Sequence, residues 1–440
     1  MSKPLVAVVG KPNVGKSTFF NKISGERISI VLDTPGVTRD RVYADADWNG
    51  RSFTLIDTGG IQLKSNDEMF NHIKRQAEIA LDVCDVILFF VDGSAGMSAE
   101  DYDVADMLRK TKKPLVLVVN KIDNFATADL SDFYALGLGE PIPISSEHML
   151  GIGDLLDIVV GHFKPADADE NESGSVRISV VGKPNVGKSS LVNRLLGFER
   201  TIVSNISGTT RDAIDTEFEV DGKKYTLVDT AGIRRKRSIE DETIEQYSVI
   251  RSLASIRKAD VCLVVLDASD EISEQDVKIA GYVHEQGKPS VVILNKWDLI
   301  EKDTHTVEKF NKRLKSDLAF MDYVEPVTVS ALTGQRTNKL MQMVDKVFEH
   351  ASFRVTTGLL NEIVNDAMSA VEPPMRSGKR LKIYYAVQVS VCPPTFIFFV
   401  NDAKLMHFSY KRYLENSLRR AFDFSGTPIR LIIRNRNEEQ

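Results

Sequence analysis

Residues 5–17 read LVAVVGKPNVGKS, an apolar run followed by a glycine-containing loop, and this stretch decides the fold. A strand followed by GxxxxGKS is typical of a P-loop, in which backbone N–H groups turn toward phosphate oxygens at the start of a helix. The octet at 10–17 recurs unchanged at 182–189, 172 residues later, which makes a chance glycine-rich turn a poor alternative. We therefore predict two phosphate-binding loops, formed by Gly10, Lys11, Pro12, Asn13, Val14, Gly15, Lys16 and Ser17 and by Gly182, Lys183, Pro184, Asn185, Val186, Gly187, Lys188 and Ser189.

Three further motifs are duplicated in the same order. A period this long exceeds that of any solenoid repeat, so the chain carries one whole domain twice. DTGG at 57–60 returns as DTAG at 229–232 and TRD at 38–40 returns at 210–212, both after 172 residues, and NKID at 120–123 returns as NKWD at 295–298, after 175.

Each copy alternates short Val/Ile/Leu runs with amphipathic stretches. Continuous apolar runs are typical of parallel strands buried on both faces, and helices between them give a doubly wound, mostly parallel α/β sheet. We expect strands at 5–9, 53–56, 86–91, 115–119 and 143–144, and in the second copy at 178–181, 225–228, 261–266, 291–294 and 327–329.

A polar segment separates the two copies. Residues 164–175, KPADADENESGS, are acidic and poor in apolar side chains, as flexible linkers are. We expect a first nucleotide-binding domain over 1–164, an acidic linker over 165–175, a second nucleotide-binding domain over 176–350 and a smaller α+β domain over 351–440.

Composition is that of a folded chain with several domains: 440 residues, 42% hydrophobic and 27% charged. The apolar runs are far shorter than the ~20 residues that span a bilayer, and no secretion signal is visible. Cys84 and Cys262 lie in apolar runs, as buried cysteines in a reducing compartment do, and no cysteine pattern indicates zinc. We expect a cytoplasmic, monomeric protein without a membrane partner.

Charge is unevenly distributed. Residues 353–440 contain 13 Lys/Arg and 8 Asp/Glu, a net of +5, which leaves −11 for the rest of a chain whose net charge is −6. Such an asymmetry indicates that the C-terminal domain meets an anionic partner.

Side chains near each P-loop suit a Mg²⁺-bound triphosphate. Lys16 and Lys188 should reach the β- and γ-phosphates, and the amides of Gly60 and Gly232 can meet the γ-phosphate. A hydroxyl between P-loop and DTxG can close on Mg²⁺ in the triphosphate state and be released on hydrolysis. We expect Mg²⁺ to be held by Ser17, Thr38 and Asp57 and by Ser189, Thr210 and Asp229, and catalysis to rest on Lys16, Thr38, Gly60, Lys188, Thr210 and Gly232.

The NKxD motifs select the base. A carboxylate there can accept two hydrogen bonds from guanine, a donor pair that adenine lacks, and such sites discriminate by ~10⁴-fold or more. We therefore expect GTP and GDP rather than ATP. The predicted contacts are the base-binding Asp123 and Asp298, the bracing Asn120 and Asn295, Lys121 and Lys296, the fifth-motif residues Ser145 and Ser330, and Thr58, Gly59, Ile61, Thr230, Ala231 and Ile233 in the DTxG segments.

The residue after DTxG is unusual for a GTPase. Ras-like proteins place there a glutamine that orients the attacking water, whereas this chain has Ile61 and Ile233. Catalytic assistance must come from elsewhere, or hydrolysis is slow. Arg39 and Arg211 are weak candidates for arginine fingers supplied by the chain itself.

These motifs, in tandem and followed by a short third domain, resemble the Der (EngA) family of bacterial ribosome-assembly GTPases over essentially the whole chain. The resemblance implies association with the large ribosomal subunit and its rRNA, and GTP hydrolysis coupled to binding and release. It also implies that Asn13 and Asn185 help to hold a K⁺ ion; the alternative is that each side chain only braces the loop. Such a cation would neutralise developing charge as an arginine finger does.

The third domain resembles the KH-like module of that family. We expect helices at 358–370 and 411–422, strands at 381–391, 395–400 and 429–433, and a turn at 392–394. The RNA-gripping GxxG loop of KH domains is absent, since 373–380 reads PPMRSGKR. Seven basic residues could contact rRNA phosphates or form a solvated surface: Arg376, Lys379, Arg380, Lys411, Arg412, Arg419 and Arg420.

One basic segment differs between the copies. RRKR at 234–237 follows the second DTAG, where the first copy has QLKS at 62–65, and we hypothesise an RNA or interdomain contact there. Two other functions remain open: the GTPase motor of a tRNA-modification system, which would need a cofactor-binding or helical domain, and a membrane-remodelling GTPase, which would need an amphipathic or transmembrane stretch.

Overall fold

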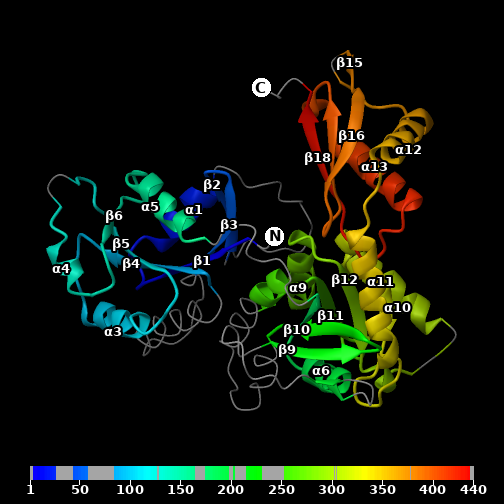
Figure 1. The fold of residues 1–440 in the computed structure, drawn as a ribbon, viewed down its shortest axis with the longest axis horizontal. Helices are drawn as coiled ribbons and strands as arrows, with labels where there is room; N and C mark the ends of the chain where they lie inside the picture. The colour runs from blue at the N-terminus through cyan, green and yellow to red at the C-terminus, as the bar shows by residue number, and fades with distance from the viewer. Residues whose placement is uncertain are drawn as a thin grey trace. The chain divides into compact units, whose positions relative to one another are not determined.

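A computed structural model describes residues 3–25, 43–57, 84–125, 128–163, 174–197, 202–203, 215–229, 252–301, 303, 305–376 and 378–436. The chain forms two compact units, Met1–Glu172 with Glu240–Arg257, and Ser173–Ile239 with Lys258–Gln440. Figure 1 shows a mixed sheet with helices in each unit. No described helix is long and apolar enough to cross a membrane.

The first unit contains a six-stranded sheet in the order β2-β3-β1-β4-β5-β6. All neighbours are parallel except β2 and β3, which form an antiparallel pair. The strands are β1 (Leu5–Val9), β2 (Tyr43–Trp48), β3 (Arg51–Asp57), β4 (Val86–Asp92), β5 (Leu115–Asn120) and β6 (Ile142–Pro143), and the helices are α1 (Lys16–Gly25), α3 (Ala99–Leu108), α4 (Ser131–Tyr134) and α5 (Ile152–Gly161).

Both faces of this sheet are buried, because alternate residues of its central strands enter different cores. Ala7 and Phe89 pack with α3 residues such as Val104, whereas Val8 and Leu88 pack on the other face with residues of α1 and α5. The doubly wound arrangement predicted from the continuous apolar runs is confirmed.

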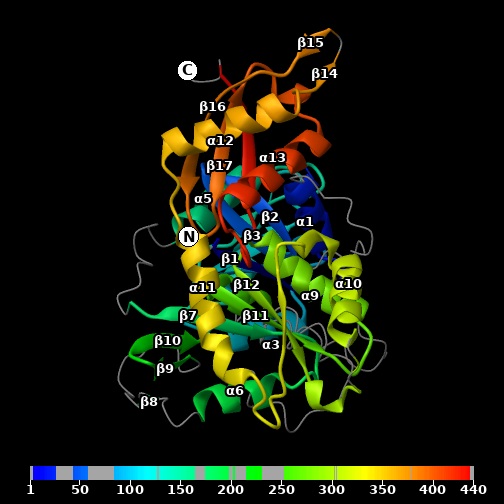
Figure 2. The same cartoon turned by 90° about the vertical axis from the view of Figure 1, so that its right-hand side faces the viewer.

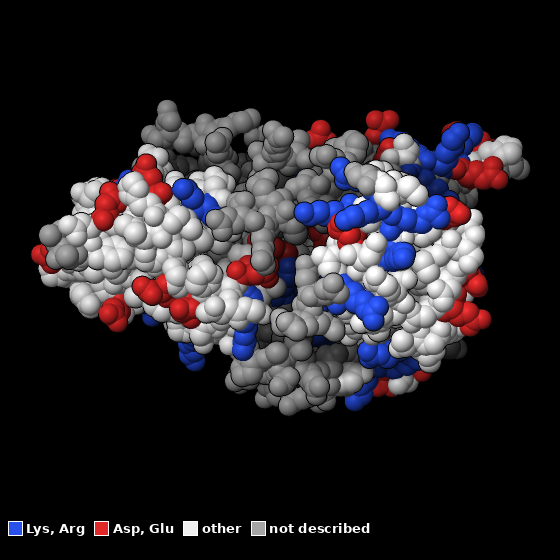
Figure 3. Space-filling model, turned by 90° about the horizontal axis from the view of Figure 1, so that it is seen from above, with Lys and Arg blue, Asp and Glu red and all other residues white. Residues whose placement is uncertain are grey.

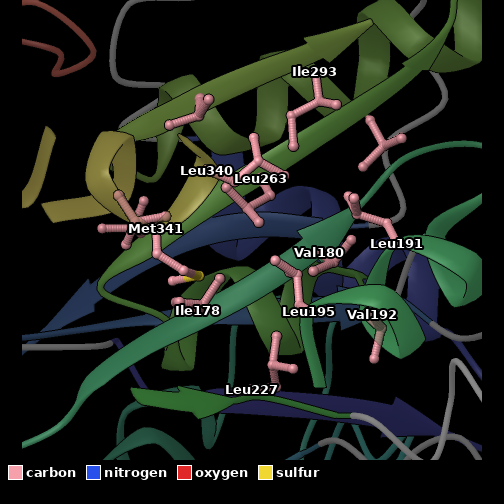
Figure 4. Packing of buried hydrophobic residues seen from close by; sticks show 14 of the residues in the cluster. Ile178, Val180, Leu191, Val192, Leu195, Leu227, Leu263, Ile293, Leu340 and Met341 are labelled. Carbon is pink, nitrogen blue, oxygen red and sulfur yellow. The ribbon is translucent and has the colours of Figure 1, made fainter. Parts of the chain in front are cut away.

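The second unit contains the repeat of that sheet, in the order β13-β12-β11-β7-β10-β9-β8. Side chains from its strands meet those of α6 and α11 in one cluster (Figure 4), where Val180 and Leu263 lie with Leu191 and Leu340. The strands are β7 (Val176–Val181), β8 (Ile202–Val203), β9 (Thr216–Val220), β10 (Lys223–Leu227), β11 (Val261–Asp267), β12 (Ser290–Asn295) and β13 (Pro326–Thr328), and the helices are α6 (Lys188–Leu196), α9 (Glu274–Glu285), α10 (Thr306–Asp317) and α11 (Leu340–Ser352), with 3₁₀ turns η4 (Trp297–Leu299), η5 (Ala319–Met321) and η6 (Thr337–Lys339).

A smaller α+β domain ends the second unit, with a three-stranded sheet in the order β16-β17-β18. Figure 2 shows α12 and α13 together on one side of this sheet. Its elements are α12 (Thr357–Ala370), β14 (Met375–Arg376), β15 (Lys379–Arg380), β16 (Ile383–Ser390), β17 (Thr395–Val400), η7 (Ala403–Leu405), α13 (Phe408–Ala421) and β18 (Arg430–Asn435).

Backbone hydrogen bonds join this small domain to the second nucleotide-binding domain. Ser290 donates its N–H to the Gly426 carbonyl over 2.7 Å, and the Gly426 N–H reaches the Tyr323 carbonyl over 2.9 Å. The Arg430 guanidinium donates to the Glu285 carbonyl over 2.9 Å. These contacts attach the small domain to the sheet edge and helix end of its neighbour.

The sequence missed four short elements. Antiparallel β2 and β9 and the β14–β15 hairpin contain many charged or polar residues, so the search for continuous apolar runs passed over them. β8 is apolar but only two residues long, too short to stand out as a run. The predicted parallel strands are all present, with ends that differ by at most two residues. Cys84 and Cys262 are buried as expected, whereas Cys392 is exposed.

Candidate nucleotide-binding sites

The two P-loops have the same backbone conformation. Asn13 and Asn185 adopt left-handed φ values of 66° and 65°, which asparagine tolerates better than most residues. Gly15 and Gly187 have φ values of 92° and 96°. A Cβ atom at either glycine would collide with the side-chain amide of the asparagine in the NKxD motif, so the loop and that motif are built against each other.

Each P-loop lysine points back into its own loop. Lys16 Nζ donates to the carbonyls of Gly10 and Lys11, both over 2.7 Å. Lys188 Nζ makes the same two bonds, to Gly182 over 2.7 Å and to Lys183 over 2.6 Å. Burial lowers the pKa of Lys16 to about 8, against an opposing effect of Asp57. The ammonium groups of Lys16 and Lys188 therefore lie within the loops that we expect to bind the phosphates.

Two of the three predicted Mg²⁺ ligands of the first copy, Ser17 and Asp57, lie together. Ser17 Oγ donates to Asp57 Oδ2 over 3.1 Å, and Asp57 is buried at the end of β3. In the second copy β10 ends at Leu227, and Asp229 has a left-handed φ of 56° with its N–H bonded to Asp215 over 3.0 Å. The two corresponding aspartates thus differ in backbone conformation: Asp57 is the last residue of a strand, whereas Asp229 lies beyond the end of its strand in a left-handed conformation.

The NKxD asparagines brace the sites as expected. Asn120 Nδ2 donates to the Val14 carbonyl over 2.7 Å, and its oxygen accepts the Ser146 N–H over 2.9 Å. Asn295 does the same with the Val186 carbonyl, over 2.7 Å, and the Ala331 N–H, over 3.0 Å. Each asparagine therefore joins the P-loop to the fifth motif.

The two base-selecting aspartates differ in their surroundings. Asp123 accepts a hydrogen bond from Ser145 Oγ over 2.8 Å. Asp298 has a buried carboxylate oxygen, Oδ1, with no hydrogen-bond partner among the described residues. A buried carboxylate oxygen without a hydrogen-bond donor costs free energy, so a ligand that donates a hydrogen bond to this atom would be favoured.

The NKxD lysines are held by an aspartate that the sequence analysis missed. Lys121 and Lys296 have left-handed φ values of 68° and 61°, and their ammonium groups pair with Asp92 over 2.6 Å and with Asp267 over 2.5 Å. Burial alone would raise the pKa of Asp92, but hydrogen bonds from Lys121 and Ser94 lower it to about 2. These pairs fix the lysine stems beside the expected base.

A second missed pair links each P-loop to a helix further along the chain, α3 in the first copy and α9 in the second. Lys11 pairs with Asp101 over 2.9 Å, and Lys183 pairs with Asp276 over 3.2 Å. Both aspartates belong to capping boxes, Ser98–Asp101 and Ser273–Asp276. The sequence did carry a sign of these capping boxes, because the Ser and Asp of each box recur after 175 residues, the same offset as the NKxD motifs.

Several predicted site residues cannot be placed. They come from the TRD segments, from the DTxG segments after the aspartate and from the basic cluster, and they lie outside the described residues: Thr38, Arg39, Thr58, Gly59, Gly60, Ile61, Thr210, Arg211, Thr230, Ala231, Gly232, Ile233 and residues 234–237.

Comparison with known proteins agrees with the tandem GTPase motifs and the KH-like third domain found in the sequence. Residues 5–121 and 177–296 match the family model described as "50S ribosome-binding GTPase", and 354–434 match "KH-domain-like of EngA bacterial GTPase enzymes, C-terminal". The proteins named GTPase Der from Ruminiclostridium cellulolyticum and Clostridium perfringens are each 56% identical to it, and that from Acetivibrio thermocellus is 54% identical. All three alignments cover the full length of both chains.

Proposed function

Because the chain belongs to the Der family of GTPases and is a GTP-hydrolysing enzyme, we propose that it binds the large ribosomal subunit and acts as a switch in its assembly. GTP or GDP occupies each of two sites, and hydrolysis changes the segments that close over the nucleotide. The proposal keeps the four expected parts: 1–164, 165–175, 176–350 and 351–440. It takes the protein to be a cytoplasmic monomer.

Guanine recognition at both sites carries this proposal. Asp298 Oδ1 is buried without a hydrogen-bond partner in the part of the chain that the structure describes, and the N1–H and exocyclic amine of guanine are the donors that would satisfy it. Ser145 holds the equivalent Asp123 in the first copy. Asn120 and Asn295 fix both base loops to the P-loops, so a base held by the aspartate and phosphates held by the loop are positioned together.

Oxygen ligands for Mg²⁺ support the metal assignment. In the first copy a hydroxyl, Ser17, and a carboxylate, Asp57, lie 3.1 Å apart beside the P-loop lysine, and such oxygens are what Mg²⁺ prefers. When bound, Mg²⁺ would neutralise charge that develops on the phosphates. We propose that Ser17, Asp57 and Thr38 hold it there, and that Ser189, Asp229 and Thr210 do so in the second copy.

Hydrolysis without a catalytic glutamine needs another source of positive charge. We propose that Lys16 and Lys188 provide part of it from inside their loops, with the amides of Gly60 and Gly232 on the γ-phosphate. K⁺ beside Asn13 and Asn185 would supply more. The left-handed φ of both asparagines accounts for this residue type by backbone geometry alone, so K⁺ dependence has to be tested separately.

The positive charge of the C-terminal domain supports the proposal of an rRNA partner. Its seven candidate residues differ, however, in exposure and in the groups they contact. Arg376, Lys379 and Arg420 are exposed. Arg419 is not suited to phosphate binding, because it pairs with Glu415 over 2.9 Å and donates to the carbonyls of Phe424 and Thr427. The remaining Arg380 and Arg412 pair with Glu372 and Asp322, and Lys411 is partly buried.

Turnover and binding measurements on matched variants test this function. Calorimetry should show two guanine nucleotides per chain and one for either Lys16→Ala or Lys188→Ala, with no comparable affinity for adenine nucleotides. GTP turnover of the same variants should be compared in K⁺ and Na⁺, with and without large subunits. Salt-sensitive co-sedimentation with large subunits is expected, and its loss at all nucleotide states would contradict the assembly role.

A further inference from the structure

One face of the C-terminal sheet carries no helix among the described residues of the second unit (Figures 1 and 2). On the opposite face, Phe396, Phe398 and Leu431 are buried against α12 and α13. Side chains alternate across a strand, so their neighbours in β17 and β18 point to the uncovered side. We call this uncovered side the open face.

Aromatic and aliphatic side chains form cross-strand rows on the open face. Strand pairing places Tyr385 beside Phe399, and Phe399 beside Arg434. The rings of Tyr385 and Phe399 stack, with centroids 4.4 Å apart and planes 16° apart. Tyr385 remains 37% exposed while Phe399 is 7% exposed, so the tyrosine covers the phenylalanine and presents an aromatic surface to solvent. The next row is Val387, Ile397 and Ile432.

Arginines border these rings without acidic neighbours in the strands. Arg436 lies over the Tyr384 ring, 4.8 Å from its centroid, and Tyr384 is 45% exposed at a register shift in β16. Arg434 is exposed and has no ion-pair partner among the described residues. β16, β17 and β18 contain no acidic residue. Figure 3 shows Lys and Arg side chains gathered on the second unit.

We propose that the open face binds single-stranded RNA, stacking bases on Tyr385 and Tyr384 while Arg434 and Arg436 contact the phosphates. Single strands expose base faces, and aromatic side chains on a sheet flanked by arginines bind them with little sequence preference. An apolar protein segment would leave the arginines without a counter-charge, and an acidic segment would gain little from the exposed rings. The proposal rests on the ribosomal partner proposed above and specifies where RNA is held without a GxxG loop.

Binding of a labelled single-stranded RNA of about ten nucleotides to the full-length chain tests the proposal by fluorescence anisotropy. Tyr385→Leu keeps apolar cover on Phe399 but removes the ring, and should weaken binding about tenfold. Arg434→Gln should weaken binding and reduce the salt-dependence slope by about one. Tyr134→Leu removes the same ring and Lys312→Gln likewise removes one positive charge at exposed positions elsewhere, and both variants should leave binding unchanged.

The outcomes separate this site from the general function. Wild-type affinity in Tyr385→Leu, or equal affinity for a duplex of the same length, would overturn the stacking site even if the protein still sedimented with large subunits. If the wild-type chain does not sediment with large subunits, the assembly role fails whatever the oligonucleotide result. Urea unfolding of each variant shows whether a loss of binding reflects a loss of folding.

Discussion

Lys11 Nζ lies 2.9 Å from Asp101 Oδ2, and Asp101 is only 1% exposed. The same carboxylate oxygen accepts the Ser98 N–H over 3.0 Å at the start of α3. The Lys11 carbonyl in turn accepts a hydrogen bond from Lys16 Nζ. The aspartate that caps the helix thus fixes the loop residue whose carbonyl positions the phosphate-binding lysine.

Removing this charge pair should weaken nucleotide binding. Lys11→Met leaves Asp101 buried without its cation, so we expect the P-loop to shift and GDP to dissociate about tenfold faster from the first site, a change of about 1.4 kcal/mol. Stopped-flow release of a fluorescent GDP, in a Lys188→Ala background, isolates that site. Lys11→Arg should restore slow release, and an equal defect in both variants would show that charge is not the cause.

Nucleotide binding at the first site should take up a proton at alkaline pH. The pKa of Lys16 is about 8 in the nucleotide-free protein, and phosphates beside the ammonium should raise it. Above about pH 8 the lysine is increasingly neutral before binding and charged afterwards, so affinity should fall by up to about tenfold per pH unit.

Calorimetry in two buffers of different ionisation enthalpy measures this proton. In the Lys188→Ala chain, uptake should approach one proton per GDP near pH 9 and vanish near pH 6.5, where Lys16 is already charged. Uptake that is the same at both pH values would argue against Lys16 as the titrating group.

The sequence identifies the P-loop and NKxD motif of each copy, which the structure joins through Asn120 and Asn295, because each motif is local. The P-loop, DTxG and NKxD motifs each follow a buried strand, and parallel strands bring their ends to one sheet edge. Contacts between a loop and a distant helix were missed, as with Lys11 and Asp101, because the sequence gives their residues but not their proximity. The open face was missed for another reason: Tyr385, Phe399 and Arg434 come from three strands and meet only through strand register.

Replacing one base-binding carboxylate should change base preference at one site. Asp298→Asn replaces two acceptor oxygens by one carbonyl oxygen and one N–H₂ group, so only one of the two guanine donors keeps an acceptor. GDP affinity at the second site should therefore fall by about 10²-fold or more. Xanthine has a carbonyl in place of the exocyclic amine and should bind better than guanine there. GDP stoichiometry should drop from two to one per chain, and xanthosine diphosphate should bind at the second site, so that the total nucleotide bound returns to two per chain.

Asp123→Asn is the matched variant for the first site and should give the same stoichiometry. Retention of two tight GDP sites in either variant would show that the carboxylate is not the base contact.

Acid should destabilise the second unit through His284, a residue in the last turn of α9 that lies near Arg419 and Arg430 of the C-terminal domain. Its Nδ1 is 3.0 Å from the Tyr323 hydroxyl, and burial, with the nearby Arg419 and Arg430, lowers the pKa of the imidazole from 6.5 to about 4. Between these values the unfolded chain binds the proton more tightly, so stability is lost as the pH falls. The loss at pH 5 should be about 2 kcal/mol relative to pH 8. Other groups also titrate in this range, so the contribution of His284 is the part of the pH dependence that disappears in His284→Asn.

Trp297 is buried in the second unit and Trp48 lies in the first. In a Trp48→Phe background, urea unfolding followed through the remaining tryptophan therefore reports on the second unit alone. Equal pH dependence in the two chains would remove His284 as the cause.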